Sequence, residues 1–217
     1  QRPQDAARYS FDAGVAALVS AKQNWRAERK CVSCHTNGWG LAAQPVIAPE
    51  SDEIAAGRIF AQGYLQNYME EGAHPRGQYG SIEGMVSTAA FLAMSDARSG
   101  KGFHEVTRRG LDHAWKLLDE SGTWEGWLQC NWPPFESDAE FGPTLALVAL
   151  GELSATTELR AQDLDALGKL SHYLLQNSPQ SLHAKAMRLW AGSSWPDIML
   201  ENENSTWRDE LVSAQAA

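Results

Sequence analysis

The feature that most constrains the fold is the helical spacing of apolar residues, which recurs along most of the chain. Phe11, Val15 and Leu18 form one stripe, and Leu111 and Trp115 belong to another. This spacing places apolar side chains on one face of an α-helix, and no segment of more than a few residues alternates as a β-strand does. Pro and Gly fall mainly between the stripes. The sequence therefore predicts an all-α protein, with helices over residues 7–24, 34–46, 52–71, 84–97, 103–119, 139–153, 161–177 and 181–192.

The predicted helices fall into pairs. The first helices of the pairs start near residues 9, 52, 102 and 161, and each is followed by a helix rich in alanine. Because small side chains let helices approach closely, we expect the second helices to form an inner layer. The expected architecture is one domain over residues 1–217, with αα-hairpin repeats in a curved array or partial αα-toroid. A plain helical bundle fits the same stripes. Residues 198–217 resemble the first helix of another pair, which favours an incomplete toroid.

Charge and hydropathy exclude several classes of protein. The 217 residues include 27 acidic and 18 basic side chains, and the net charge of -9 argues against a nucleic-acid partner. No apolar run is long enough to predict a membrane span. The opening segment QRPQDAARYS lacks the apolar stretch of a secretory signal. We therefore expect either a mature chain whose leader has been removed or a fragment.

The strongest chemical signal is the segment Cys31-Val32-Ser33-Cys34-His35. Two thiols separated by two residues can each form a thioether bond to a vinyl group of one haem, and the adjoining imidazole can bind the iron. The pattern C-x-x-C-H is typical of c-type haem attachment. The sequence thus predicts one covalent haem c, with Cys31 and Cys34 as anchors and His35 as proximal ligand.

Two other chemistries use the same residues. A redox dithiol of the thioredoxin type expects a βαβ context, which this helical sequence does not provide. Zinc can use Cys31, Cys34 and Cys130 with a histidine, although no second C-x-x-C or H-x-x-x-H supplies a full ligand set. Both alternatives remain open beside haem.

Aromatic and basic residues flank the motif. Trp25 and Trp39 either pack on the porphyrin or belong to the ordinary core. The flanking basic side chains are Lys22, Arg26, Arg29 and Lys30. They can pair with the haem propionates, form a docking patch for a redox partner, or simply be solvent-exposed side chains at the end of a helix.

The sixth position of the iron has many candidate ligands. They are the methionines at 69, 85, 94, 187 and 199 and the histidines at 74, 104, 113, 172 and 183; an open position is the alternative. If all inner helices start at the same end of the array, the motif lies beside the loops at 72–85 and 122–139. This placement favours His74 or Met85, with Tyr79 as an outside choice.

The segment from Cys130 to Asp138 is the second candidate of chemical interest. Glu136 and Asp138 can bind a cation, accept protons or cap the following helix, and capping is the default for acidic groups before a helix. Cys130 is most simply a buried free thiol, with a place beside the haem as the alternative.

Three blocks of sequence resemble a known family. They are NW…CVSCHT…AQP around the motif, TRRGLDHAW with GTWEGWLQCNWPPFESDAEFGPTLALVAL, and SLHA…LWA near residue 190. The family consists of large planctomycete-type secreted proteins that combine a C-x-x-C-H haem motif with squalene-cyclase/prenyltransferase-like αα-toroid repeats. The resemblance implies a toroid-like fold and a haem protein.

The chain departs from that family pattern in ways that limit the inference. The toroid repeat Q-x-x-x-G-x-W appears here with Leu118 in place of Gln, and neither a D-x-D-D proton-donor motif nor a prenyltransferase zinc site is recognisable. Family members usually continue into further repeats. The resemblance therefore does not imply terpene cyclisation.

Three functional hypotheses follow. The first is a monohaem c-type cytochrome that transfers single electrons in the periplasm or elsewhere outside the cytoplasm. The second is a haem enzyme with an open sixth position, acting on a small ligand such as peroxide or a nitrogen oxide, with His74, Tyr79, Glu136 or Asp138 handling protons. The third is a subunit of a larger redox complex, in a homo- or hetero-oligomer. We expect the first and third to hold together.

Overall fold

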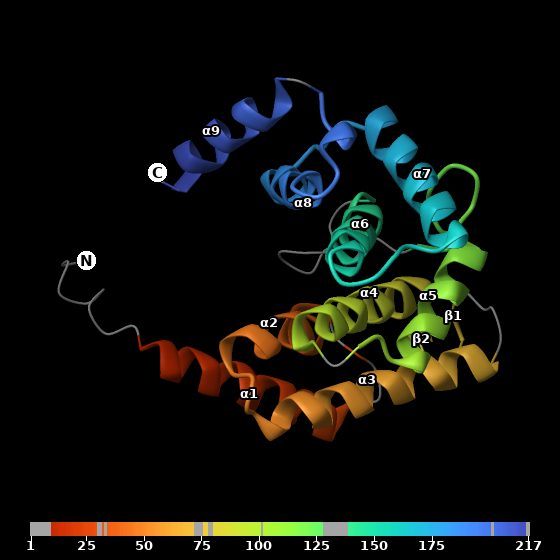
Figure 1. Ribbon diagram of the computed structural model, residues 1–217. Helices are drawn as coiled ribbons and strands as arrows, with labels where there is room; N and C mark the ends of the chain where they lie inside the picture. The colour runs from red at the N-terminus through yellow and green to blue at the C-terminus, as the bar shows by residue number, and fades with distance from the viewer. Residues whose placement is uncertain are drawn as a thin grey trace.

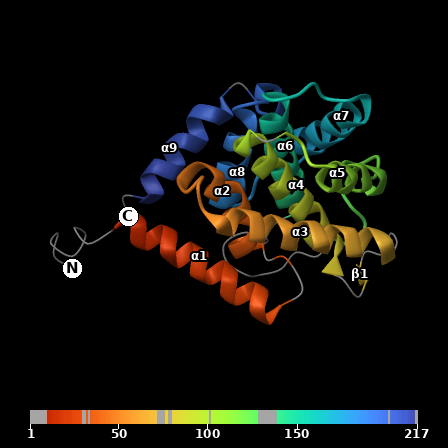
Figure 2. The same cartoon turned by 60° about the horizontal axis from the view of Figure 1, so that its bottom comes forward.

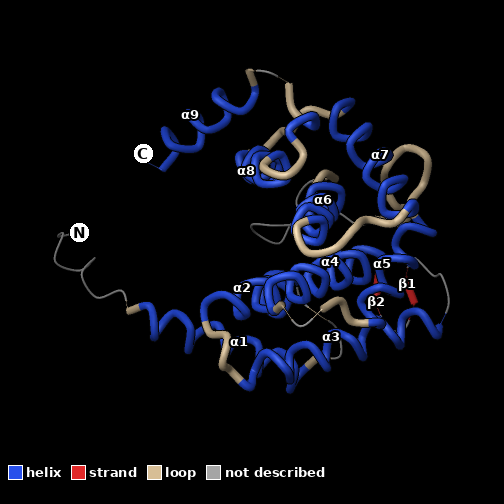
Figure 3. The backbone as a smooth tube through the Cα atoms, in the orientation of Figure 1, coloured by secondary structure: helices blue, strands red, loops and turns tan. Residues whose placement is uncertain are grey.

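The computed structural model describes residues 10–29, 32, 34–71, 76–77, 80–100, 102–127, 139–200 and 202–215. Its helices are α1 (Phe11–Glu28), η2 (Cys34–Gly38), α2 (Trp39–Ile47), α3 (Asp52–Glu71), α4 (Ile82–Ser99), α5 (Glu105–Leu117), α6 (Phe141–Ser154), α7 (Ala161–Gln176), α8 (Leu182–Gly192), η3 (Pro196–Ile198) and α9 (Glu203–Gln215). Two short strands, β1 (Arg76–Gly77) and β2 (Gly80–Ser81), pair antiparallel. The predicted all-α class is confirmed (Figure 3).

Local capping explains where the observed helices depart from the predicted ranges. Ser81 caps α4 by accepting a hydrogen bond from the backbone N–H of Gly84, so this helix starts two residues earlier than predicted. Gly100 ends α4 in the left-handed conformation, with φ of 64°, which glycine adopts without steric cost. Ser10 caps α1 in the same way as Ser81 caps α4. Boundaries are therefore decided by single polar residues or glycines.

The alanine-rich helices form the inner layer, as expected. α2, α4, α6 and α8 pack successively against one another, and α3, α5 and α7 lie outside them (Figure 1). Nearly every side chain of α4 from Ile82 to Asp96 is buried, and α6 is buried over almost its whole length. α1 and α9 lie on the same side of the molecule in both views (Figures 1 and 2).

The inner helices run parallel to one another. A Cβ atom at Gly38 would overlap the Phe91 ring, and further along both helices Arg98 donates to the carbonyl of Ala42 at 2.8 Å. α2 and α4 therefore advance in the same direction. Arg98 also forms an ion pair with Glu152, which joins the last turns of α4 and α6.

The same order holds between α6 and α8. Phe141 at the start of α6 stacks on His183 at the start of α8, with ring centroids 6.1 Å apart. At the other end, a Cβ at Gly151 would overlap the Ser194 side chain, which follows α8 directly. The inner helices therefore share one direction as expected, but α2 starts level with Phe91 in the middle of α4, so their starts do not all lie at one end.

Aromatic side chains of the first and the last inner helix are in contact. Trp39 of α2 stacks on Trp190 of α8, with centroids 5.7 Å apart, and makes an edge contact with Phe91 at 5.1 Å. The guanidinium of Arg98 lies 5.9 Å from the centre of the Trp190 ring. The row of inner helices thus curves until its two ends touch.

A buried arginine joins the C-terminal helices. Arg188 is 2% exposed, donates from Nη2 to Glu140 at 2.6 Å and to the carbonyl of Asn177, and donates from Nη1 to the carbonyl of Leu174 at 2.8 Å. Its guanidinium also lies 5.8 Å from the centre of the Trp207 ring. The Arg188 side chain belongs to α8. It therefore connects α8 to the start of α6, to the end of α7 and to α9.

Candidate functional site

The C-x-x-C-H motif leads into the first inner helix. Cys34 and His35 open η2, which is a π-helical turn that continues directly into α2. π-helical turns are rare and are frequently found at functional sites. η2 contacts α1, α2 and α4, and its last residue, Gly38, lies against Phe91 in the middle of α4.

Several of the predicted site residues lie outside the described residues, so their placement stays a prediction. They are Lys30, Cys31, His74, Tyr79, Cys130, Glu136 and Asp138. For Cys34 and His35 the description covers the backbone but not the side chain. The geometry of the site is therefore built from the residues that surround the motif.

Helix α4 presents polar groups on the face that meets η2. Phe91 faces Gly38. Ser87 lies one turn before Phe91 and about 40° around the helix from it, and Glu83 lies two turns before it and about 80° around. Because α2 and α4 are parallel, this polar part of the face lies toward the end at which Cys34 is found. Ser87 is 1% exposed. Within the described residues, neither Ser87 Oγ nor the buried Glu83 Oε2 has a hydrogen-bond partner.

The π-helical turn contributes polar groups of the same kind. Asn37 is 2% exposed, and both polar atoms of its side chain are without a partner in the described part of the chain, as is Thr36 Oγ1. Leaving a buried polar group unsatisfied costs about 1–3 kcal/mol, so such groups are few in native proteins. Thr36 and Asn37 of η2, with Ser87 and Glu83 of α4, are groups of this kind.

Met85, one of the two favoured iron ligands, is fully buried at 0% exposure. It lies six residues before Phe91, which corresponds to about 120° around the helix from the face that meets η2. Its role as an iron ligand stays a prediction. Glu83 and Ser87 are nearer to that face than Met85 is.

The flanking residues divide into different environments. Trp39 belongs to the aromatic contact with Phe91 and Trp190, and whether it also contacts a porphyrin stays a prediction. Arg29 is exposed at the end of α1, where its guanidinium lies 5.7 Å from the centre of the Trp25 ring. The exposed Arg29 and the half-buried Trp25 therefore form one edge next to the motif.

Lys22 was grouped with the basic residues that flank the motif, but it is 0% exposed. It is the one buried residue of α1 among the described residues. Its Nζ donates to Gln44 Oε1 and lies 4.0 Å from Glu53 Oε1. A Cβ at Gly40 would overlap the Lys22 stem, and one at Gly57 would lie 3.1 Å from Nζ. The two glycines make the channel through which this lysine reaches between α2 and α3.

Two cations of this cluster, Lys22 and Arg26, face the single carboxylate of Glu53. Burial lowers the pKa of Lys22 from 10.5 to about 8, against the opposing attraction of Glu53. Burial by itself raises the pKa of Glu53, but hydrogen bonds from Arg26 and Gln23 and the nearby positive charges outweigh it, so the pKa of Glu53 is lowered. The cluster clamps α1, which precedes the motif, to α2, which follows it.

The buried lysine predicts a stability that depends on pH. Between pH 8 and 10.5 the unfolded chain keeps the Lys22 proton that the folded chain has released, so the free energy of unfolding rises with pH in this window. Relative to Lys22→Met, we expect this rise to be greater in the native sequence by about 2–3 kcal/mol. Urea unfolding at several pH values measures it. The exposed Lys116→Met is the control; a rise of equal size in Lys22→Met would contradict the prediction.

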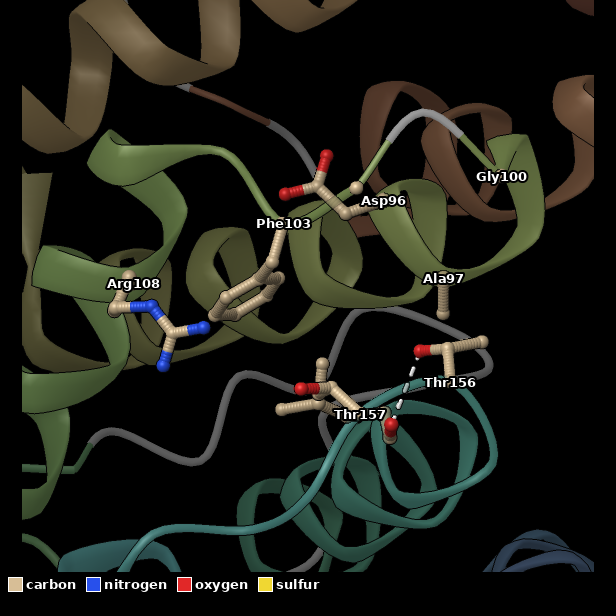
Figure 4. Close-up of a pocket in the computed structure, with 9 residues that line it drawn as sticks. Asp96, Ala97, Gly100, Phe103, Arg108, Thr156 and Thr157 are labelled. Atoms are coloured by element: carbon tan, nitrogen blue, oxygen red, sulfur yellow. Dashed lines mark hydrogen bonds between the residues drawn. The ribbon is translucent and has the colours of Figure 1, made fainter.

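A cavity of about 390 Å³ lies at the opposite end of α4 and α6 (Figure 4). Arg108 lies over the Phe103 ring at 4.5 Å on one side of it, and Thr157 lies on another. Asp96 in its wall is already engaged, because it pairs with Arg58 and accepts from the backbone N–H of His104 at 2.9 Å. The Asp96 carboxylate therefore serves to hold the helices together, and the region around the C-x-x-C-H motif remains the better candidate site.

Sequence reasoning missed the buried polar groups near the motif. Glu83 and Ser87 stand four residues apart in a helix that is otherwise apolar or small-sided up to Met94. Polar residues at i and i+4 on a helix expected to be wholly buried are a usable signal, because such groups need partners. Asn37 carries no comparable signal, since a polar residue two positions after the histidine is equally consistent with an exposed turn.

Comparison of the chain with protein-family models, with curated proteins and with solved structures finds no match.

Proposed function

We propose that this protein is a monohaem c-type cytochrome that transfers single electrons as a subunit of a larger redox complex outside the cytoplasm. The observation that carries the proposal is the C-x-x-C-H motif, which leads into a π-helical turn before the first inner helix. The unpartnered buried groups of Asn37, Glu83 and Ser87 fit a bound group that has hydrogen-bonding atoms. Haem supplies an iron centre that takes up and releases one electron.

The chain's own residues have distinct parts in this proposal. Cys31 and Cys34 fix the cofactor covalently, and His35 supplies a nitrogen ligand to it. The Lys22 clamp holds α1 and α2 on either side of the motif, which limits movement of the ligand. The buried aromatic rings around Trp39 keep water away from the adjacent core.

The proposed architecture is a partial αα-toroid like that of the planctomycete-type secreted haem proteins. The two layers of helices and the contact between Trp39 and Trp190 support it, because a toroid requires an inner ring that curves back on itself. In the described residues no helix is both long and apolar enough to cross a bilayer. A redox protein partner is part of the proposal, and the edge of Arg29 and Trp25 is the surface proposed to meet it.

An intact-mass measurement with an absorption spectrum tests the function. The protein, produced with a haem-attachment system, is expected to show a haem-sized mass excess and a Soret band that survives denaturation. A low-spin reduced spectrum unchanged by carbon monoxide is expected for electron transfer. A colourless protein that contains zinc would overturn the proposal, and a native mass equal to one chain would count against a complex.

A second candidate function is favoured by one observation. The unpartnered Asn37, Glu83 and Ser87 are polar groups of the kind that orient a small ligand on iron, rather than the apolar lining of a simple electron carrier. This favours a haem enzyme with an open sixth position. A high-spin reduced form that binds carbon monoxide distinguishes it from the first candidate.

A further inference from the structure

We propose that the cavity beside Arg108 binds a small organic acid, that is, a carboxylate attached to an apolar body. The cavity has a volume of about 390 Å³ and lies between the loop that joins α4 to α5 and the segment that follows α6 (Figure 4). The proposal uses neither the C-x-x-C-H motif nor a haem. It therefore adds a second site to the molecule and can be tested separately from the proposed function.

Arg108 supplies a positive charge that no other described residue neutralises. Its guanidinium lies 4.5 Å from the centre of the Phe103 ring, and within the described part of the chain its side chain forms no ion pair or hydrogen bond. Of the acidic residues of α5, Asp112 pairs with Arg160, and Glu105 forms no ion pair with a described residue. The half-buried Arg108 therefore keeps donors available on the wall of the cavity.

The acidic residue in the same wall is already occupied. One carboxylate oxygen of Asp96 accepts from Arg58, and the other accepts from the backbone N–H of His104 at 2.9 Å. A cation in the cavity would be repelled by Arg108, whereas an anion would be attracted to it. A guanidinium can donate two parallel hydrogen bonds to one carboxylate, so a carboxylate is the anion that fits this side chain.

The helix ends around the cavity do not reverse this preference. Carbonyl groups at the C-terminus of a helix disfavour anions, and α6 ends here. Its Leu153 carbonyl, however, accepts from the backbone N–H groups of Thr156 and Thr157 at 3.0 and 2.9 Å. α5 begins two residues after Phe103, and the N–H groups of its first turn favour an anion. The charge of Arg108 therefore decides the sign of the ligand.

The size and the lining of the cavity indicate a ligand with an apolar body. Cavities of about 300–1,000 Å³ hold whole organic molecules rather than single ions. Ala97, Leu153 and Phe103 contribute apolar surface to the walls. The Thr157 side chain forms no hydrogen bond with a described residue, and in Figure 4 its hydroxyl is turned toward the side on which Arg108 lies. A carboxylate held by these two polar groups would leave its apolar body against the aliphatic wall.

The experiment titrates phenylacetate into the full chain as purified and measures the heat of binding. Phenylacetate carries a carboxylate on an apolar ring. Phenylacetamide has nearly the same shape without the charge, and acetate has the charge without the ring. We expect phenylacetate to bind at least about 10-fold more tightly than either of the other two, because only phenylacetate satisfies both parts of the cavity.

Two variants separate the charge from the shape of the site. Arg108→Gln is expected to weaken phenylacetate binding about 10- to 100-fold, as expected for the loss of hydrogen bonds between charged groups. Ala97→Leu places extra atoms in the cavity and is expected to abolish the advantage of phenylacetate over acetate. Arg109→Gln, at the neighbouring exposed arginine that does not line the cavity, is the matched control and is expected to bind phenylacetate as the native protein does.

Three outcomes would overturn the proposal. Phenylacetamide that binds as tightly as phenylacetate would exclude an anion site. Equal losses in Arg108→Gln and Arg109→Gln would show binding through general surface charge. A native protein that takes up no phenylacetate at millimolar concentration would show that the cavity is not a site for organic acids. None of these outcomes changes the haem-sized mass or the Soret band, so the proposed function is decided independently.

Discussion

Replacing Cys34 by serine is expected to abolish stable haem attachment, and Cys31→Ser is expected to do the same. A serine hydroxyl does not form the thioether bond, so haem held by the remaining contacts should be extracted by acidified acetone. Intact mass before and after extraction measures the loss directly. In the native sequence, the haem-sized excess is expected to persist.

Cys130→Ser is the matched control for the thiol replacement. Under the haem proposal Cys130 is not an anchor, so this variant is expected to keep both its covalent haem and its Soret band. Under the zinc alternative all three cysteines serve as ligands, and Cys130→Ser would lose metal as Cys34→Ser does. Equal loss of bound metal in both variants, with no haem in either, would contradict the covalent-haem prediction.

Arg188→Ala is expected to lower the free energy of unfolding by about 3–5 kcal/mol, the range found when one partner of a buried ion pair is removed. The substitution takes the guanidinium away from Glu140 and from the carbonyls of Leu174 and Asn177 at once. It also removes the cation that lies against Trp207. Urea unfolding followed by circular dichroism measures the change.

Arg188→Lys keeps a positive charge but cannot reach the three acceptors with one planar group, so an intermediate loss is expected. The exposed Arg208→Ala, on α9, is the control and is expected to change the stability by less than about 0.5 kcal/mol. A loss below 1 kcal/mol in a folded Arg188→Ala protein would show that the C-terminal helices do not depend on this residue.

Much of the fold was predictable because its causes are local. The spacing of the apolar stripe that begins at Phe11 and of the alanines of α4 follows the 3.6-residue period, and this alone predicts helices. The inner and outer layers could be predicted from side-chain size. The ends of several helices shifted, and those of α4 are set by Ser81 and Gly100. The short strands β1 and β2 and the turn η3 were not predicted.

Of the candidate site, only the residues proposed to attach the haem could be predicted from the sequence. Cys31, Cys34 and His35 are adjacent in the sequence, so their pattern is visible without a fold. Lys22 was misjudged, because a lysine next to a charged helix end normally lies in water, and its burial depends on two glycines of other helices.

The sequence by itself determined the helical class, the pairing of long helices with small-sided ones, and the haem-type motif, since each of these depends on neighbours within a few positions. The tertiary structure decided which polar groups are shut away from water near that motif, and it decided that Trp39 meets Trp190. These outcomes depend on the register in which whole helices pack, and that register is a property of many distant contacts acting together.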